Sequence, residues 1–154
     1  MTQQAFQDNY PDEFSYCYGC GRLNDHGLKI KSYWDGEESI ARFVPDAHYI
    51  AIPGFVYGGL IASLIDCHCV GTAAAASIRE SGLEPGSQPG PRFVTASLKV
   101  DYLAPTPLGV ELEIRASATE VKAKKVVVIA SVSAGGQVCA KGQVVAVRLP
   151  DTMR

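Results

Sequence analysis

Alternating apolar and polar residues mark two short strands in the first third of the chain. The stretches GLKIKSYW, residues 27–34, and SIARFVP, residues 39–45, both alternate. A period of two places the apolar side chains on one face, which is typical of a half-buried strand. Asp35-Gly36 between them is a common hairpin turn, and Pro45 ends the second run. The pattern therefore predicts an antiparallel hairpin.

The pattern becomes helical from Gly58 onward. Four large apolar residues recur at helical spacing: Leu60, Ile61, Leu64 and Ile65. They are followed by GTAAAAS, residues 71–77, whose small side chains allow a helix to approach a sheet closely. Because few charges interrupt this stretch, we expect a long, enclosed helix from Gly58 to about Ser81.

After a Pro/Gly-rich loop over residues 82–92, the rest of the chain reads almost entirely as strand. The alternating or β-branched runs cover residues 93–105, 111–121, 124–134 and 137–149. Short turns join these runs, as antiparallel neighbours require. One helix must be covered by one sheet. We therefore predict an α+β fold in which a curled antiparallel sheet of about five or six strands wraps one long central helix.

Length and composition indicate one globular domain. The chain has 154 residues, of which 47% are hydrophobic, and its mean hydropathy is +0.05, which argues against disorder. The polar, acidic residues 1–16 predict a flexible N-terminal arm, and residues 17–150 form the expected domain.

Charge and hydropathy also exclude some classes of partner. The formal net charge is −2, and no basic stripe interleaved with aromatic residues is visible, so we expect no nucleic-acid partner. The chain begins without the charged and apolar pattern of a signal peptide, and no run of about 18 apolar residues stands out. We therefore expect a cytoplasmic protein without membrane binding.

The five cysteines cannot all pair within the chain. Cys17 and Cys20 form a CxxC pair, and His26 could add a third metal ligand. A zinc site takes about four ligands, and the second half of a paired CxxC pattern is missing, so we expect no metal. The alternative is a tight turn with reduced thiols. Cys67 and Cys69 lie in the small-residue helix and are interpreted as core residues.

Two features of the predicted helix suggest chemistry. Gly58 and Gly59 open it, and the unpaired N–H groups of a helix N-terminus can stabilise a carbonyl oxygen that becomes negative in acyl transfer. Asp66 is a lone carboxylate in a low-charge helix and can act as a base or a nucleophile. The alternatives are close backbone packing for the glycines and a solvent-facing or capping role for the carboxylate.

The spacing between these features indicates a shared site. Eight residues of helix separate Gly58 from Asp66 by about 12 Å, so one small reacting group cannot touch both in a single chain. Two helices running antiparallel across a two-fold axis bring the glycine of one chain to the aspartate of the other. The chemistry then requires a dimer with two equivalent sites.

Three motifs carry a resemblance to a known family. PGFVYGG, residues 53–59, is followed after six residues by Asp66, then by VTASLKVDYLAPTPLG, residues 94–109, and is preceded by CYGCG-x2-ND-x-GL, residues 17–28. This combination resembles the hotdog-fold acyl-CoA thioesterases, in particular their PaaI-like (phenylacetate-degradation-type) branch, over residues 17–148. The resemblance implies hydrolysis of an acyl-CoA thioester to free acid and coenzyme A (CoA). It also implies no cofactor beyond the CoA of the substrate, and a homodimer or a dimer-of-dimers tetramer.

The resemblance also implies roles for individual residues. In such enzymes the N–H at the position of Gly58 polarises the thioester carbonyl, the carboxylate at Asp66 is the general base or nucleophile, and the hydroxyl at Thr95 lies near the catalytic water. Tyr57 and Gly59 flank this position and are expected to contact the substrate. The phosphates of CoA are expected to bind to basic side chains: Lys124, Lys125 and, as a weaker candidate, Arg79.

The chain departs from the family pattern in two places. Tyr57 replaces the usual histidine before the glycines, and Ala51 and Ile52 lie where some members have an amide that assists the carbonyl. These departures favour an alternative function, a non-catalytic acyl or acyl-CoA binding module; a structural oligomer without a ligand is a third. The Tyr57 hydroxyl can donate a hydrogen bond, although a packing role is the stronger expectation.

Two histidines need a separate interpretation. His68 follows Asp66 by two residues, about 200° around the helix, so the two cannot share a face. We expect His68 to be packed or interfacial, and it is the second candidate for proton transfer. His48 precedes Asp66 by eighteen residues, too far to match the spacing of hotdog dehydratases.

Overall fold

The computed structural model describes residues 3–85 and 90–153, so the predicted loop over 82–92 lies partly outside the described residues. The strands are β1 (Ser32–Asp35), β2 (Glu38–Phe43), β3 (Phe93–Tyr102), β4 (Leu112–Val121), β5 (Lys125–Ala134) and β6 (Gln137–Arg148). The long helix is α1 (Gly58–Glu80), and short 3₁₀ helices span Phe6–Asn9, Asp12–Phe14, Ala47–Tyr49 and Asp151–Met153.

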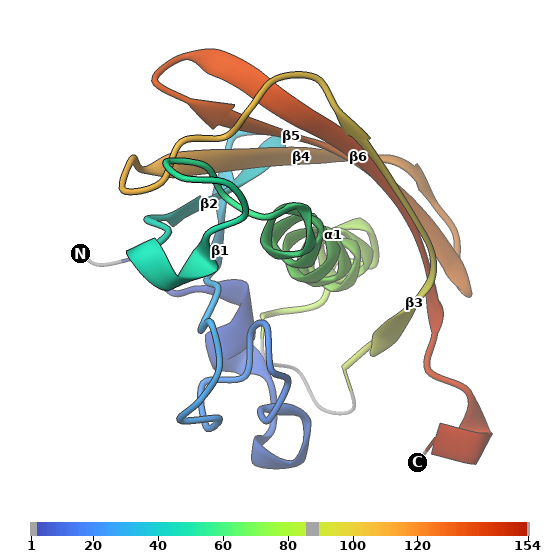
Figure 1. The fold of residues 1–154 in the computed structure, drawn as a ribbon. Helices are drawn as coiled ribbons and strands as arrows, with labels where there is room; N and C mark the ends of the chain where they lie inside the picture. Colours follow the sequence, from blue (N-terminus) through green and yellow to red (C-terminus); the bar gives the residue numbers. More distant parts are fainter. Residues whose placement is uncertain (1–2, 86–89, 154) are drawn as a thin grey trace.

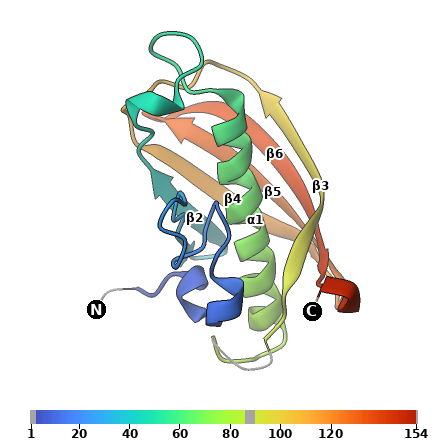
Figure 2. The same cartoon turned by 60° about the horizontal axis from the view of Figure 1, so that its bottom comes forward.

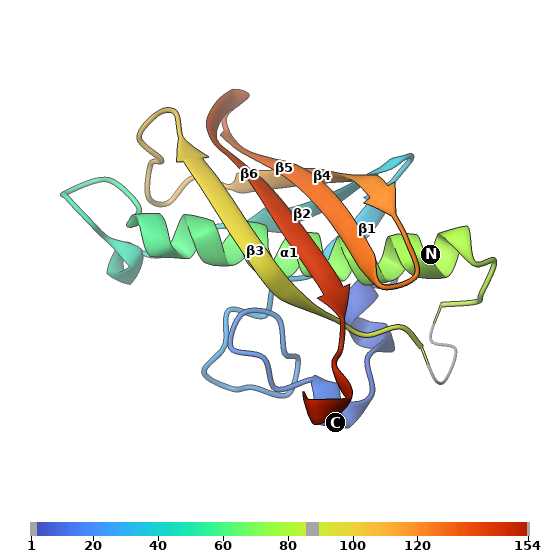
Figure 3. The ribbon, with the colours of Figure 1, turned by 90° about the vertical axis from the view of Figure 1, so that its right-hand side faces the viewer.

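A single antiparallel sheet curls around α1, as the sequence predicted. Its strand order is β1-β2-β4-β5-β6-β3, with β1 and β3 at the two edges. Figure 1 looks along α1 and shows the sheet arching over it. Figure 3 shows the strands crossing in front of the helix, with β3 at the edge. The α+β hotdog architecture with six strands is therefore confirmed.

The hairpin and the helix begin and end close to their predicted limits. Asp35 pairs with Glu38, and Gly36 in the turn has a φ of 65°, which a two-residue hairpin loop favours. The first strand is shorter than predicted, because Lys29 adopts a φ of 55° and interrupts the extended backbone. Ser81 caps the end of α1, as expected.

The core lies between α1 and the concave face of the sheet. Leu64 and Ile65 of α1 are fully buried, as are Val128 and Val144 of the central strands. The helix comes close to the sheet at Gly142 on β6, where an added Cβ would lie 2.7 Å from the Ile65 side chain. A side chain at this position would push the helix away from the sheet.

Length and apolar composition alone would allow α1 to span a membrane, which differs from the expectation that no such run exists. The helix is nevertheless covered by the sheet, and most of its apolar stretch is buried within the fold. A core helix passes the same test of composition because burial in protein and burial in lipid both select apolar residues. Its place in the fold makes α1 a core helix.

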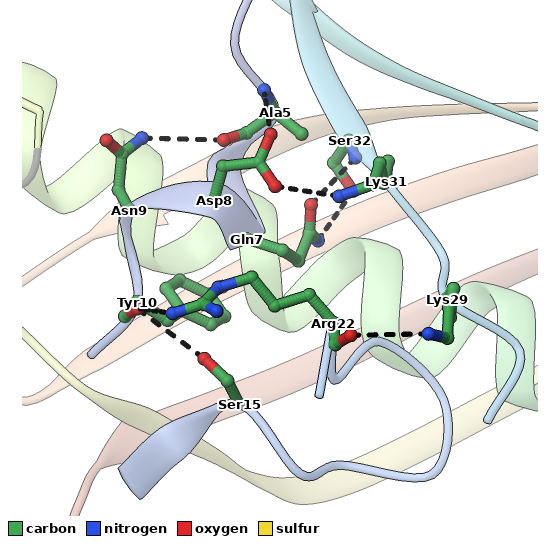
Figure 4. Close-up of polar contacts among 10 residues, drawn as sticks. All are labelled: Ala5, Gln7, Asp8, Asn9, Tyr10, Ser15, Arg22, Lys29, Lys31 and Ser32. Atoms are coloured by element: carbon green, nitrogen blue, oxygen red, sulfur yellow. Dashed lines mark hydrogen bonds and ion pairs between the residues drawn. The ribbon is translucent and has the colours of Figure 1, made fainter. Parts of the chain in front are cut away.

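The described part of the predicted flexible arm, residues 3–16, is packed rather than loose. Figure 2 shows this N-terminal segment beside the C-terminal half of α1. The Gln7 amide accepts a hydrogen bond from the Ser32 N–H at 2.8 Å and donates to the Ser32 hydroxyl at 3.1 Å (Figure 4). Lys31 forms an ion pair with Asp8 at 2.7 Å. The partners that satisfy these polar groups lie 23 or 25 residues away in the sequence, and composition alone does not reveal them.

Candidate functional site

The structure brings two of the predicted catalytic residues together. Asp66 is half-buried in the middle of α1, and Thr95 is exposed near the start of β3. The Thr95 hydroxyl donates a hydrogen bond to the Asp66 carboxylate at 2.6 Å. Helix α1 packs against β3, and the hydroxyl is held by a strand while the acid is held by a helix. Both groups are thus fixed by rigid elements.

A cavity of about 300 Å³ lies beside this pair. Its wall comes from four parts of the chain: the N-terminal segment, the middle of α1, the start of β3 with the residues before it, and Leu149 after β6. Phe14, Val70 and Phe93 make much of this wall apolar, while Asp66 and Thr95 contribute oxygen atoms. Pockets with apolar walls and a few convergent polar groups commonly bind small molecules.

The N-terminus of α1 presents free hydrogen-bond donors. Tyr57 precedes the helix with an extended backbone and makes no side-chain cap. Within residues 3–85 and 90–153, no group accepts a hydrogen bond from the N–H of Gly58 or Gly59. The Tyr102 hydroxyl instead donates to the Gly58 carbonyl at 2.7 Å. These N–H groups, at the positive end of the helix dipole, are available to a ligand.

The ring of Tyr57 lies against the second of these glycines. An added Cβ on Gly59 would lie 2.3 Å from the ring of Tyr57, so that ring lies directly against the Gly59 backbone. Tyr57 itself is largely exposed. One chain therefore places Tyr57, Gly58 and Gly59 together at the helix start. Asp66 remains about two helical turns further along α1, as the spacing predicted.

The predicted CoA-binding cations fall into two separate groups. Lys124 and Lys125 lie at the turn between β4 and β5, where the Lys125 ammonium pairs with Glu120 at 3.3 Å. Arg79, near the end of α1, stacks on the ring of Trp34 at 3.6 Å and donates to the Gly36 carbonyl at 3.1 Å. Among the described residues, no hydrogen bond or ion pair links Arg79 to either lysine. Arg79 holds the β1–β2 turn against the helix.

His68 belongs to a buried polar network that the sequence did not reveal. Its Nδ1 is 2.8 Å from the Ser32 hydroxyl and its Nε2 is 3.1 Å from the Ser39 hydroxyl. Ser39 also contacts the hydroxyl of Thr72 at 2.6 Å. Burial lowers the pKa of His68 to about 4. Both ring nitrogens are occupied, so the expectation of a packed role is confirmed, and the role in proton transfer is unsupported.

Three sulfur atoms meet at the edge of the cavity. Those of Cys17, Cys20 and Cys67 lie within 4.8 Å of one another, and Cys17 and Cys67 are 3.8 Å apart. His26, which the sequence offered as a possible third ligand beside the CxxC pair, is exposed and lies outside this group. The core interpretation holds fully for Cys69, which is completely buried. Cys67 is half-buried and packs against the core, and in addition the 17–20 turn folds over its sulfur atom.

Hydrogen bonds among these thiols shift their pKa values in opposite directions. The thiols of Cys20 and Cys67 donate to Cys17 and lower its pKa, with further help from the backbone N–H groups of Cys20 and Gly19. The same contacts raise the pKa of Cys67, and burial adds to that effect. Cys17 is thus the most acidic of the three thiols.

Comparisons with solved structures agree with this architecture. A Thioesterase superfamily protein from Shewanella loihica PV-4 is 51% identical, the match covers 92% of this chain and 100% of that one, and the TM-score is 0.69. The PaaI protein from the phenylacetic acid degradation operon of E. coli is 16% identical, with 80% and 81% covered and a TM-score of 0.65. A thioesterase from Haemophilus influenzae is 14% identical, with 84% and 85% covered and a TM-score of 0.67. The last two likenesses show the fold alone.

The family is established by sequence as well. No curated protein matches the chain. The sequence pattern of the Thioesterase superfamily, however, matches residues 53–141, more than half of the chain, and this stretch includes Gly58, Asp66 and Thr95. The chain therefore belongs to the Thioesterase superfamily and has the hotdog fold of that family's enzymes.

Proposed function

We propose that this protein hydrolyses an acyl-CoA thioester to the free acid and CoA. The observation that carries the proposal is the Asp66–Thr95 pair, a carboxylate hydrogen-bonded at 2.6 Å and lining an apolar cavity of about 300 Å³. An apolar cavity suits an acyl group, and a carboxylate at its wall suits the activation of water. Membership in the Thioesterase superfamily supports thioester hydrolysis in general.

Thr95 and Asp66 divide the handling of water between them. The Thr95 hydroxyl has one proton, which it donates to Asp66, so its oxygen can accept a hydrogen bond from a water molecule. Asp66 takes a proton from that water while the oxygen of the water attacks the thioester carbonyl. The carbon–sulfur bond then breaks, and the CoA thiolate takes up the proton. Direct attack by the carboxylate is the alternative route to the same products.

The oxyanion formed in this reaction is assigned to the N–H of Gly58 from a second chain. Within one chain the helix separates Gly58 from Asp66, so the site is completed only across a two-fold axis. Small or half-exposed residues form an open stripe along α1: Gly59, Ala62, Ser63 and Asp66. Such a stripe allows two antiparallel helices to approach each other closely.

The sheet supports the same pairing. Strand β3 lies at an edge with most of its side chains exposed, and an edge strand presents unpaired backbone groups to a second strand. Tyr102 and Leu103, at the end of β3, are more than half exposed beside the helix N-terminus. We therefore propose a homodimer, or a tetramer built from two such dimers. The remaining expectations, a cytoplasmic location and no cofactor apart from the CoA of the substrate, are part of the same proposal.

CoA phosphates are assigned to the β4–β5 turn. Lys124 carries no ion pair within the described part of the chain, and Lys125 shares an exposed pair with Glu120 that contributes little and can be exchanged for a phosphate. Arg79 is the weaker candidate because its guanidinium already stacks on Trp34.

The activity is tested with a panel of acyl-CoAs of different chain length and with aryl-acyl groups. Loss of thioester and release of CoA are followed by chromatography, because the five cysteines of the chain would consume a thiol-trapping reagent. Release of CoA supports the hydrolase. Saturable binding without release supports the alternative, a binding module, which Tyr57, Ala51 and Ile52 favour.

The shared site has its own test. Gly58→Pro removes the N–H, and proline is tolerated at the first position of a helix after an extended residue such as Tyr57. We expect Gly58→Pro and Asp66→Asn each to be nearly inactive. Refolding or co-expressing the two at equal amounts should restore about a quarter of wild-type activity, because half of the dimers are mixed and each has one intact site. Absence of recovery in a mixture that contains mixed dimers would contradict the shared site.

A further inference from the structure

We propose that Cys17, Cys20 and Cys67 bind one thiolate-preferring divalent cation, with Zn²⁺ as the expected ion. The sulfur atoms of these residues converge from the 17–20 turn and from the middle of α1. The inference concerns metal binding and stands whether or not the protein hydrolyses thioesters.

The distances suit tetrahedral zinc. A Zn–S distance of about 2.3 Å at a tetrahedral angle places two sulfur ligands about 3.8 Å apart. Cys17 and Cys67 are 3.8 Å apart, and all three sulfur atoms lie within 4.8 Å of one another. Small shifts of side chains would bring all of them into the first coordination shell. Thiolates favour zinc over harder cations such as Mg²⁺ or Ca²⁺.

The turn that carries two of the ligands is built closely around the third. An added Cβ on Gly19 would lie 2.3 Å from the Cys67 sulfur, so the backbone of the turn passes directly over that atom. Hydrogen bonds hold the turn: the Gly21 N–H donates to the Cys17 carbonyl at 2.8 Å, and the Ile30 N–H donates to the Gly19 carbonyl at 3.0 Å. Ligands held by such a fixed backbone are ordered before the metal binds.

Neither core packing nor a disulfide accounts for all three cysteines. Cys69 and Cys139 are each buried separately in the core. Cys17, in contrast, is exposed, and Cys20 and Cys67 are half-buried. Cys20 and Cys67 pack against the core, but packing does not account for the exposed Cys17. A disulfide would use two of the three sulfur atoms and leave the third unpaired. A metal ion uses all three.

The cysteine cluster lies beside the proposed site. All three cysteines line the cavity that also holds Asp66, and Cys67 is the next residue of α1. Three sulfur ligands leave one tetrahedral position, which a water molecule from the cavity would fill. The metal would tie the 17–30 segment to α1 and so fix one wall of the cavity.

The test uses the full chain, purified under reducing conditions from cells supplied with zinc. We expect about one zinc ion per chain by elemental mass spectrometry. Exchange for Co²⁺ should give the thiolate-to-metal charge-transfer absorption and the intense visible bands of a tetrahedral site. Cys17→Ser and Cys67→Ser should lower metal affinity more than about 100-fold. Cys139→Ser, a cysteine outside the cluster, should bind metal normally.

A second measurement on the wild-type chain guards against variants that fail to fold. Zinc should slow alkylation of Cys17, Cys20 and Cys67, as mapped by mass spectrometry, relative to the same protein after chelation. The proposal is overturned if the folded, reduced chain binds neither Zn²⁺ nor Co²⁺, or if metal binding persists in Cys67→Ser. If the wild-type chain binds zinc but hydrolyses no thioester, the proposed function fails and the metal site stands.

Discussion

Asp66 and His68 are two polar residues two positions apart on α1, and the fold treats them in opposite ways. Asp66 is half-buried, accepts one hydrogen bond from Thr95, and lines a cavity. His68 is fully buried, and the hydroxyls of Ser32 and Ser39 occupy both of its ring nitrogens. The helix turns by about 200° between them, so one faces the cavity and the other faces the β1–β2 hairpin.

The difference in hydrogen-bond partners distinguishes a residue that can act on a substrate from one that stabilises the fold. A buried polar group whose partners are all supplied by the protein has no capacity left for a substrate, and its burial depends on those partners. A carboxylate with one partner keeps lone pairs free for water. On this comparison, changes at Asp66 should affect turnover, and changes at His68 should affect stability.

The largest effect is expected from Asp66→Asn. The amide keeps the shape of the side chain but cannot take a proton from water, so turnover should fall by about 10²- to 10⁴-fold. Steady-state hydrolysis of the best acyl-CoA substrate measures it. The melting temperature should stay near that of the wild type. Glu80→Gln, the same change at an exposed position of α1, is the matched control and should leave turnover unaltered. Wild-type rates for Asp66→Asn would remove the carboxylate from the reaction.

A change at His68 is expected to lower stability and leave turnover intact. His68→Ala leaves a cavity and removes one hydrogen-bond partner from each of two buried hydroxyls, so the free energy of unfolding should fall by about 3 kcal/mol. Urea unfolding at neutral pH measures the change, and activity per folded molecule should stay close to normal. His26→Ala, at an exposed histidine, serves as the control. A stable but inactive His68→Ala protein would contradict the comparison.

The comparison also predicts a dependence on pH. Burial lowers the pKa of His68 from 6.5 to about 4, so the unfolded chain binds a proton there before the folded chain does. The stabilisation is complete above about pH 6.5 and is lost as the pH falls toward about 4, by up to about 3 kcal/mol. The difference in unfolding free energy between wild type and His68→Ala should therefore shrink over this range. A difference that is constant from pH 7 to pH 4 would show that His68 does not titrate as described.

The smallest of the expected effects lies at Thr95. Thr95→Val removes the 2.6 Å hydrogen bond to Asp66 without changing the size of the side chain much, and turnover should fall about tenfold. Thr95→Ser retains the hydroxyl and should recover most of the loss. Wild-type turnover in Thr95→Val would contradict a role for the hydroxyl in the reaction.

The N-terminal segment and the cysteines show where sequence reasoning stops. The polar stretch before Cys17 resembles a loose arm, yet Gln7 forms hydrogen bonds with Ser32. Gln7 also packs closely on α1: a Cβ added to Gly71 would lie only 2.9 Å from the amide nitrogen of Gln7. Similarly, the CxxC pair was matched with His26 because that residue is near in sequence. The third sulfur comes from Cys67, fifty residues after Cys17.

The sequence by itself determined the long helix and the strands with their turns, and it placed Gly58, Gly59 and Asp66 on that helix. These follow from periodicity and from local turn chemistry, which act over a few residues. Only the tertiary structure decided that Thr95 meets Asp66, that Ser32 and Ser39 enclose His68, and that three cysteines converge. Those contacts join residues 29 to 50 positions apart, and many sequences that share the same local pattern would place other side chains there.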